Sequence, residues 1–312
     1  MFTEVEFQNF RGFADLKLRG LKSVNLVVGR NNAGKTSLLE GIALLAQPDQ
    51  LSELHHLLRP SSGNVSQRYY RWLIRDQTNA QRALLSANAD RVIMLKKNSP
   101  VVGASDGMKL FWGQEGFTAF ANQEIKSLKC GIVSVLPRSP EELVKLFASA
   151  VSKRGGEEQM DSLFRELDER IRKVRVIPNQ DGLHVMLDFN LSELVPLSQV
   201  GQGVHRLLTI FSELIAGDAK ICIIDEMENG VHHTMLKQVW AGIATAAASL
   251  NVQVFATTHS HECIEAAHEA FSERDNYDFS VVQLFRLDEG VQGRVLDRKH
   301  IEAALAGEID LR

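Results

Sequence analysis

A glycine-bearing loop near the start of the chain has the residue types and the spacing that bind a phosphate chain. It fits the pattern G-x-x-x-x-G-K-[ST] in full and reads Gly29-Arg30-Asn31-Asn32-Ala33-Gly34-Lys35-Thr36, followed by Ser37. In such a loop the backbone N–H groups converge on the phosphates, and the glycines permit the turn and the close approach. Lys35 reaches the β- and γ-phosphates, and the Thr36 hydroxyl is a ligand for Mg²⁺. The loop therefore predicts a nucleoside triphosphate site.

Two carboxylates follow an apolar tetrapeptide in the last third of the chain. Ile221–Ile224 is typical of a buried strand, and Asp225 and Glu226 come directly after it. Open α/β sheets bind ligands at the carboxyl ends of their strands, so we expect Asp225 to hold Mg²⁺, directly or through water. Glu226 is placed to polarise the water that attacks the γ-phosphate. Alone, an Asp-Glu pair after a strand usually only opens a loop, but with the phosphate loop it predicts hydrolysis.

A second buried strand ends in the polar run Thr257–Ser260. If it neighbours the strand before the acidic pair, His259 can hydrogen-bond the γ-phosphate or the attacking water. We therefore predict Lys35, Glu226 and His259 as the catalytic residues. Two alternatives remain: a helix N-cap formed by Thr258 and Ser260, or a zinc site formed by His259, His261 and Cys263. No pair among these zinc candidates has a familiar structural-site spacing.

A serine- and glycine-bearing segment, Leu197–Gly203, precedes a helix that carries Arg206. Such a segment makes a second anion-binding helix terminus. In isolation it is a helix cap with a flexible lead-in.

The elements that must position these residues follow from the hydrophobic pattern. Strands are predicted at Phe2–Phe7, Asp15–Leu18 and Val24–Val28, and a helix begins at Thr36. The last third alternates helices at 203–214, 233–250 and 261–271 with strands at 221–224, 253–257 and 281–287. Apolar strands separated by helices predict an α/β fold with a mixed, mostly parallel sheet flanked by helices, preceded by antiparallel β strands.

The middle of the chain gives weaker signals. Helices are predicted at 51–58, 67–87, 139–153 and 157–173, and short strands at 92–95, 109–112 and 132–136. Asp181-Gly182 predicts a hairpin between 174–177 and 183–189. We expect one domain over 1–312, consisting of N-terminal strands and phosphate loop (1–47), a β/helical insertion (48–195) and a lobe with the glycine segment, acidic strand and histidine strand (196–312).

Composition limits the class of protein. The chain has 312 residues, 44% hydrophobic and 24% charged, which suits a soluble globular protein. The net charge of −4 excludes a strongly basic surface that coats nucleic acid, though not a local basic patch. Three cysteines are too few for a disulfide framework. No apolar run approaches the ~20 residues that span a bilayer, and the N-terminus lacks the order of a signal peptide, so we expect a cytoplasmic protein.

The order of these four elements resembles the ABC-type ATPase heads of the RecF/SMC branch, and in particular the OLD-like (overcoming lysogenisation defect) ATPases. The resemblance covers both ends of the chain and is weakest at 48–137. It rests on Asn9-Phe10-Arg11, Gly29–Glu40, Gly201-Gln202-Gly203 with Arg206, Asp225–His233 and Gln253–Ser260.

The resemblance implies ATP and Mg²⁺ as ligands and a head-to-tail homodimer, or a higher oligomer, with two ATP molecules between the subunits. Ser198, Gly201, Gln202 and Gly203 would then act on the γ-phosphate bound to the other subunit, and Glu228–His232 would lie at the interface. Arg11 would approach the nucleotide from the N-terminal strands. The glycine segment has one residue more than the usual Leu-Ser-Gly-Gly-Gln. Gln47 and Gln67 are both candidates for the family's Q-loop glutamine.

Three functions are compared on this basis. The first is an ATP-hydrolysing switch that controls a separate effector, a nuclease or toxin, in bacterial anti-phage defence, because the chain ends about 50 residues after His259, too soon for the family's Toprim nuclease. The second is a RecF-like DNA-binding repair ATPase that uses Arg68–Trp72 with Lys96, Lys97, Lys126 and Lys129. The simpler interpretation of Arg68–Trp72 is an amphipathic helix with Tyr69 and Trp72 in its core face. The third, a transporter ATPase, is disfavoured by the Asn-Phe-Arg element and the altered glycine segment.

Overall fold

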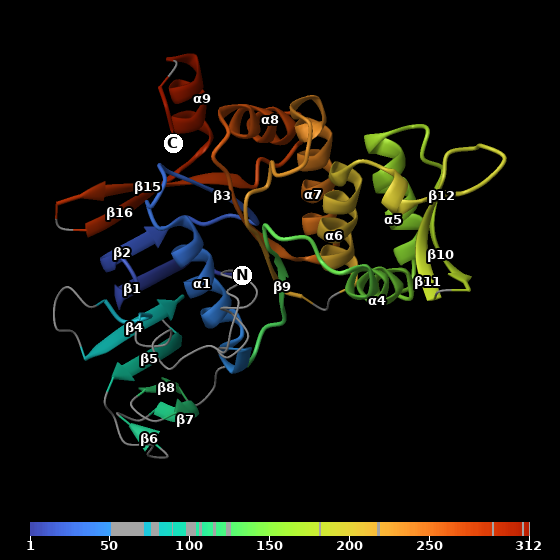
Figure 1. Ribbon diagram of the computed structural model, residues 1–312. Helices are drawn as coiled ribbons and strands as arrows, with labels where there is room; N and C mark the ends of the chain where they lie inside the picture. Colours follow the sequence, from blue (N-terminus) through green and yellow to red (C-terminus); the bar gives the residue numbers. More distant parts are fainter. Residues whose placement is uncertain are drawn as a thin grey trace. The chain divides into compact units, whose positions relative to one another are not determined.

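A computed structural model describes residues 1–50, 72–75, 81–88, 90–97, 104–105, 108–114, 117–122, 126–180, 182–216, 219–288, 290–307 and 309–311 (Figure 1). The chain forms two compact units, one of 1–130 with 279–312 and the other of 131–278. No helix among the described residues is long and apolar enough to cross a membrane.

The first unit contains a seven-stranded antiparallel sheet in the order β2-β1-β4-β5-β8-β7-β6. In sequence order its strands are β1 (Glu4–Phe10), β2 (Phe13–Arg19), β4 (Arg82–Ala87), β5 (Arg91–Lys97), β6 (Ala104–Ser105), β7 (Met108–Gln114) and β8 (Phe117–Ala121). Along β1 the buried Val5 and Phe7 alternate with less buried polar residues, as expected for a strand with one covered face. The strands between 82 and 121 thus extend the N-terminal sheet, because β4 pairs directly with β1.

Helix α1 (Lys35–Ala46) covers the inner face of β1. A Cβ atom at Gly41 would lie 2.3 Å from a ring carbon of Phe7, so only glycine permits this approach. A short 3₁₀ helix, η1 (Pro48–Gln50), follows α1.

The two ends of the chain meet within the first unit. Strand β3 (Val24–Val28) is fully buried and pairs in parallel with β15 (Phe279–Leu287). Strand β15 then pairs antiparallel with β16 (Gly290–Leu296), and α9 (Arg298–Ala306) follows (Figure 1). The sequence pattern did not predict β16 or α9.

The second unit is built around two parallel strands, β13 (Ile221–Ile224) and β14 (Gln253–Thr257), with β9 (Cys130–Val133) beside β13. The helices α6 (Gln202–Ala216), α7 (Leu236–Leu250) and α8 (His261–Ser272) pack in sequence, α6 on α7 and α7 on α8 (Figure 1). Two 3₁₀ helices, η2 (Leu197–Gln199) and η3 (His233–Met235), precede α6 and α7.

The remainder of the second unit is formed by α4 (Pro140–Val151), α5 (Gly156–Leu167) and a three-stranded sheet. The strands of this sheet are β10 (Lys173–Asn179), β11 (Gly182–Asp188) and β12 (Val195–Pro196). Helix α4 begins with the predicted cap: Ser139 Oγ accepts the Glu142 N–H, and the Glu142 carboxylate accepts the Ser139 N–H. The predicted hairpin is confirmed by the antiparallel pairing of β10 and β11.

The α/β prediction is confirmed, since parallel pairs (β3–β15 and β13–β14) stand beside antiparallel ones. Two helix predictions are wrong in part. Residues 82–87 form strand β4 because Ala83, Leu85 and Ala87 bury one face with period 2. The helix predicted to reach Lys173 ends at Leu167, and Lys173 begins β10. The same helix prediction is wrong for 72–75, where a turn leads to a bridge between Ile74 and Phe10. The predictions for 51–58, 67–71 and 76–80 lie outside the described residues.

Candidate nucleotide site

The phosphate loop lies between β3 and α1, and two of its glycines are required by its shape. Gly29 has a φ of 148°, and a Cβ there would lie 2.5 Å from the carbonyl oxygen of Leu284. Gly34 has a φ of 96°, and a Cβ there would lie 3.0 Å from the ring of Phe13. Asn32 is also left-handed, with a φ of 62°. The backbone is therefore folded tightly around the start of α1, in a form that side chains at these glycines would prevent.

Lys35 points back into this loop. Its ammonium donates hydrogen bonds to the carbonyl oxygens of Gly29, at 2.6 Å, and Arg30, at 3.1 Å, and the residue is 7% exposed. Thr36 and Ser37 follow in the first turn of α1, which contains no acidic residue. The N-terminal N–H groups of the helix and the lysine charge together favour an anion at this position.

Arg11 forms a bidentate ion pair with Glu40 in α1. Its Nε and Nη2 donate to the two carboxylate oxygens at 2.8 and 2.9 Å, and the two side chains are 10% and 1% exposed. Arg11 lies in the turn between β1 and β2 and has a φ of 54°. Glu40 was not predicted as a site residue, because only the fold brings it to Arg11.

Gln47 stands at the opposite end of α1 from the phosphate loop. It follows the last helical residue, and its side-chain oxygen accepts the N–H of Cys130. A 12-residue helix is about 18 Å long at 1.5 Å per residue, so Gln47 cannot serve the nucleotide that Lys35 would bind. Gln67, the other Q-loop candidate, lies outside the described residues.

The acidic pair lies at the end of β13 in the second unit. Thr257, the last residue of β14, donates its hydroxyl proton to Oδ1 of Asp225 at 2.6 Å and accepts the N–H of Glu226 at 2.8 Å. Asp225 is 6% exposed, and Glu226 has a φ of 50°. A hydroxyl that orients one carboxylate oxygen and fixes the next residue's backbone is a supporting element of the kind that metal ligands have. Thr257 was not predicted as a site residue.

His259 lies at the same edge, because β13 and β14 are neighbouring parallel strands. The backbone N–H of His259 donates to Oε1 of Glu228 at 2.7 Å. The N-cap alternative holds for Ser260, whose hydroxyl accepts the N–H of Cys263 at the start of α8. Among the described residues no group of three or more His, Cys, Asp and Glu could hold a metal ion, and burial raises the pKa of Cys263 to about 12.

The glycine segment forms η2 and leads into α6, and its glycines differ in their surroundings. A Cβ at Gly203 would lie 2.7 Å from the carbonyl oxygen of Gly230, in the loop after the acidic pair. A Cβ at Gly201 would meet nothing within 4 Å. Ser198 lies in η2, and Gln202 is the exposed first residue of α6.

Arg206 ties the first turns of α6 to the acidic strand end. It donates to the carbonyl oxygens of Ser134, Asp225 and Glu226, the last at 3.2 Å. Burial lowers the pKa of its guanidinium, and the nearby carboxylates of Asp225, Glu226 and Glu228 oppose this shift. The second unit thus joins the acidic pair, His259 and the start of the glycine-segment helix. The first unit joins the phosphate loop with α1 and the Arg11–Glu40 pair.

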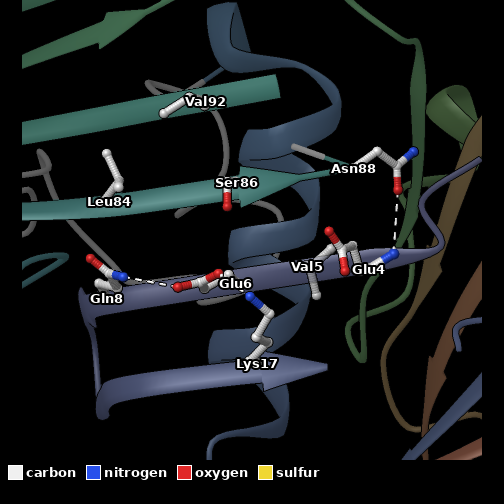
Figure 2. A pocket seen from close by; sticks show the side chains of 9 residues that line it. All are labelled: Glu4, Val5, Glu6, Gln8, Lys17, Leu84, Ser86, Asn88 and Val92. Carbon is white, nitrogen blue, oxygen red and sulfur yellow. Dashed lines mark hydrogen bonds and ion pairs between the residues drawn. The ribbon is translucent and has the colours of Figure 1, made fainter. Parts of the chain in front are cut away.

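A surface cavity of about 270 Å³ lies elsewhere in the first unit, on the face of the antiparallel sheet opposite α1 (Figure 2). Glu6 accepts hydrogen bonds there from Lys17 and Gln8, both at 2.9 Å, and these bonds lower its pKa. The cavity carries more carboxylates than cations, so its charge does not suit a phosphate. Its lining residues are Glu4, Val5, Glu6, Gln8, Lys17, Leu84, Ser86, Asn88 and Val92.

Comparison with known proteins gives two family models. Residues 1–96 match the "AAA ATPase domain", and residues 135–265 match the "AAA domain, putative AbiEii toxin, Type IV TA system". An "ATP/GTP phosphatase" of Helicobacter pylori is 24% identical over 334 aligned positions, covering 88% of this chain and 90% of the relative. An uncharacterized protein of Methanocaldococcus jannaschii is 46% identical over 44 residues, which are 14% of this chain and 20% of that protein.

Solved structures that it resembles include SMC heads. An SMC head bound to the C-terminal winged-helix domain of ScpA matches with a TM-score of 0.61 at 13% identity, covering 98% of this chain and 99% of that one. The SMC head domain of Thermotoga maritima matches with a TM-score of 0.52 at 11% identity, covering 95% and 99%. At these identities the structures show the shared fold, and the family models show that residues 1–96 and 135–265 are similar to AAA-type ATPase-domain sequences.

Proposed function

We propose that this chain, an ABC-type ATPase of the RecF/SMC class, is a switch subunit that closes into a dimer on ATP and reopens after hydrolysis. The observation that carries the proposal is the edge of the second unit, where two parallel strand ends bring together Asp225, Glu226 and His259. This is where a strand-end triphosphate site needs a metal ligand, a base for water and a γ-phosphate contact.

Each role follows from the chemistry of one side chain. Lys35 would leave the loop carbonyls for the β- and γ-phosphates, because an anion is a better partner for its ammonium than a neutral carbonyl. Gly29, Asn31–Gly34 and Ser37 complete the proposed nucleotide-binding set of the first unit, whereas the guanidinium of Arg11 contacts Glu40 of α1. Glu226 would accept a proton from the water whose oxygen attacks the γ-phosphorus, and ADP would leave. His259 would hydrogen-bond the γ-phosphate or that water.

Thr36 and Asp225 have the donor chemistry that Mg²⁺ prefers, a hydroxyl and a carboxylate oxygen. Thr257 occupies Oδ1 of Asp225, while Oδ2 accepts no hydrogen bond from any described residue. Each of these two residues, one in the first unit and one in the second, therefore has donor chemistry that suits Mg²⁺. When bound, Mg²⁺ supplies positive charge to the β- and γ-phosphates.

The dimer is proposed because the backbone of the glycine segment is accessible at Gly201, while the helix that follows is held in place by hydrogen bonds and close packing. Nothing would meet a Cβ at Gly201 within 4 Å, whereas Gly203 and Arg206 fix the start of α6 to the loop after β13. Ser198, Gly201, Gln202 and Gly203 would donate to the γ-phosphate held by the other subunit. ATP would then add contacts that exist only in the closed dimer.

For the biological role we propose control of a separate effector, a nuclease or toxin, in bacterial anti-phage defence, as the OLD-like resemblance implies. The family model that matches 135–265 is named for a putative toxin of a toxin–antitoxin system, and this supports a connection with toxin control. The SMC head bound to a domain of ScpA illustrates a head of this fold that works with a protein partner.

A RecF-like DNA-binding role is the second candidate, and one observation favours it. Trp72 was predicted in the core face of a helix, but it is 61% exposed in a turn, so that interpretation is wrong for this residue. Residues 68–71 lie outside the described residues. An ATP-dependent gel shift of duplex DNA that weakens with salt would support this role, and no shift at low salt would contradict it.

The test combines two variants with one control. Lys35→Ala should lose ATP binding, whereas Glu226→Gln should bind ATP, lose hydrolysis and elute as a stable dimer with Mg-ATP. The control is Glu269→Ala, an exposed residue of α8 paired with Lys237, which should behave as wild type. Unchanged ATP binding by Lys35→Ala would contradict the phosphate-loop assignment. A purely monomeric Glu226→Gln in light scattering would contradict the dimer.

A further inference from the structure

A third carboxylate, Glu228, lies at the acidic strand end and has no role in the mechanism above. Its Oε1 accepts the backbone N–H of His259 at 2.7 Å. Its Oε2 is buried and has no hydrogen-bond partner among the described residues. Glu228 therefore bridges the loop after β13 and the loop after β14 with a single side chain.

This arrangement is costly for a residue that only fills space. A buried carboxylate oxygen without a partner loses its hydration and gains no hydrogen bond in return. The nearest compensation is electrostatic, because Glu228 is one of the three carboxylates whose charges act on Arg206. What Glu228 supplies in return is an acceptor for the backbone N–H of His259, and an amide oxygen at this position could accept the same hydrogen bond.

The position of Glu228 is itself fixed by the backbone. The N–H of Met227, the buried residue before it, donates to the carbonyl oxygen of Thr257 at 2.8 Å. The backbone carbonyl oxygen of Glu228 accepts the N–H of Val231 at 3.0 Å. The Glu228 carboxylate therefore approaches His259 from a loop that is held at both ends and adjoins the acidic pair.

We propose that Glu228 is a positioning residue that fixes the backbone of His259, so that the imidazole meets the γ-phosphate or the attacking water. The proposal rests on the proposed function, because it requires His259 to act in ATP hydrolysis. Glu228 touches no substrate in this scheme and acts through His259 alone. Loss of the acceptor releases the His259 N–H, and the imidazole loses its fixed direction.

The test is a double-mutant cycle on kcat with Glu228→Ala and His259→Ala. Glu228→Ala should lower kcat about 10- to 100-fold, the scale of a misplaced catalytic group, with KM for ATP unchanged because the phosphate loop is untouched. In the His259→Ala background, Glu228→Ala should change kcat less than about twofold. Glu228→Gln, which keeps an amide oxygen as acceptor, should recover most of the activity.

Equal losses from Glu228→Ala in both backgrounds, or a wild-type kcat, would overturn the proposal. If Glu228→Ala fails to fold, as judged by its thermal transition, the same cycle is run with Glu228→Met, which fills similar space without a hydrogen-bond acceptor, and with Glu228→Gln as its isosteric control. Wild type and Glu226→Gln separate the two levels of inference. A wild type without ATPase activity would contradict the proposed function. If wild type hydrolyses ATP, Glu226→Gln does not, and Glu228→Ala keeps the wild-type kcat, only the positioning role is contradicted.

Discussion

The Arg11–Glu40 pair allows a quantitative test of what anchors the phosphate-loop helix. The sequence predicts that Arg11 contacts nucleotide, whereas its guanidinium is bidentate on Glu40 of α1. If the pair anchors α1, Glu40→Ala should destabilise the protein even without ATP, because it removes the carboxylate that two nitrogens of a largely buried guanidinium contact.

The magnitude follows from burial. Removing one member of a buried ion pair costs about 3–5 kcal/mol, and exposures of 10% and 1% place this pair in that class. At about 2 °C per kcal/mol for a large domain, the first thermal transition should fall by about 6–10 °C. The matched control is the exposed pair Arg19–Glu4, at 3.3 Å with 69% and 37% exposed side chains, where Glu4→Gln should cost less than about 1 kcal/mol.

The assay is thermal unfolding of the single variants and of the double variant Arg11→Ala/Glu40→Ala, without nucleotide. Side chains that act as a pair should be non-additive by about 1–3 kcal/mol. If both variants keep the wild-type transition while Arg11→Ala raises KM for ATP, the anchoring argument fails and direct contact with nucleotide is the better account.

Two further predictions use pairs of residues within the second unit. Gly203→Ala should lower the unfolding free energy by about 1–3 kcal/mol, because its Cβ would clash with backbone, whereas Gly201→Ala should leave it within about 0.5 kcal/mol and reduce only ATP turnover. Losses of unfolding free energy of similar size in Gly203→Ala and Gly201→Ala would contradict the packing argument. Burial raises the pKa of Glu213 above 4.5, against the opposing charge of Arg138, so its folded state holds a proton at higher pH than its unfolded state. Wild type should therefore lose unfolding free energy relative to Glu213→Gln as pH rises above about 4.5, and parallel pH curves in urea denaturation would refute this.

Much of the fold was predictable because it depends on local signals. The strand, loop and helix around Lys35 follow from residues adjacent in sequence, as do the cap at Ser139 and the hairpin around Gly182. The segment 82–87 shows the limit of such signals. Its alanines and leucines suit a helix as well as a strand, and its pairing with β1 on one side and β5 on the other decides for the strand.

The candidate site divides in the same way. Lys35, Asp225 and Glu226 could be predicted because phosphate and metal chemistry requires these residue types after a loop or a buried strand. Glu40, Thr257 and Glu228 could not, because each acts on a partner brought close by the fold, 29 to 32 positions away in sequence.

These supporting residues share one physical property that sequence patterns do not record. Each is a polar side chain whose hydrogen bond joins two segments: Glu40 joins α1 to the β1–β2 turn, and Thr257 and Glu228 join the ends of β13 and β14. Because an unmatched buried polar group costs more than a made hydrogen bond returns, each link holds its segments to one arrangement. A site that must orient water against a phosphorus atom needs that fixed arrangement, and these residues are where a substitution should alter turnover without altering the reacting groups themselves.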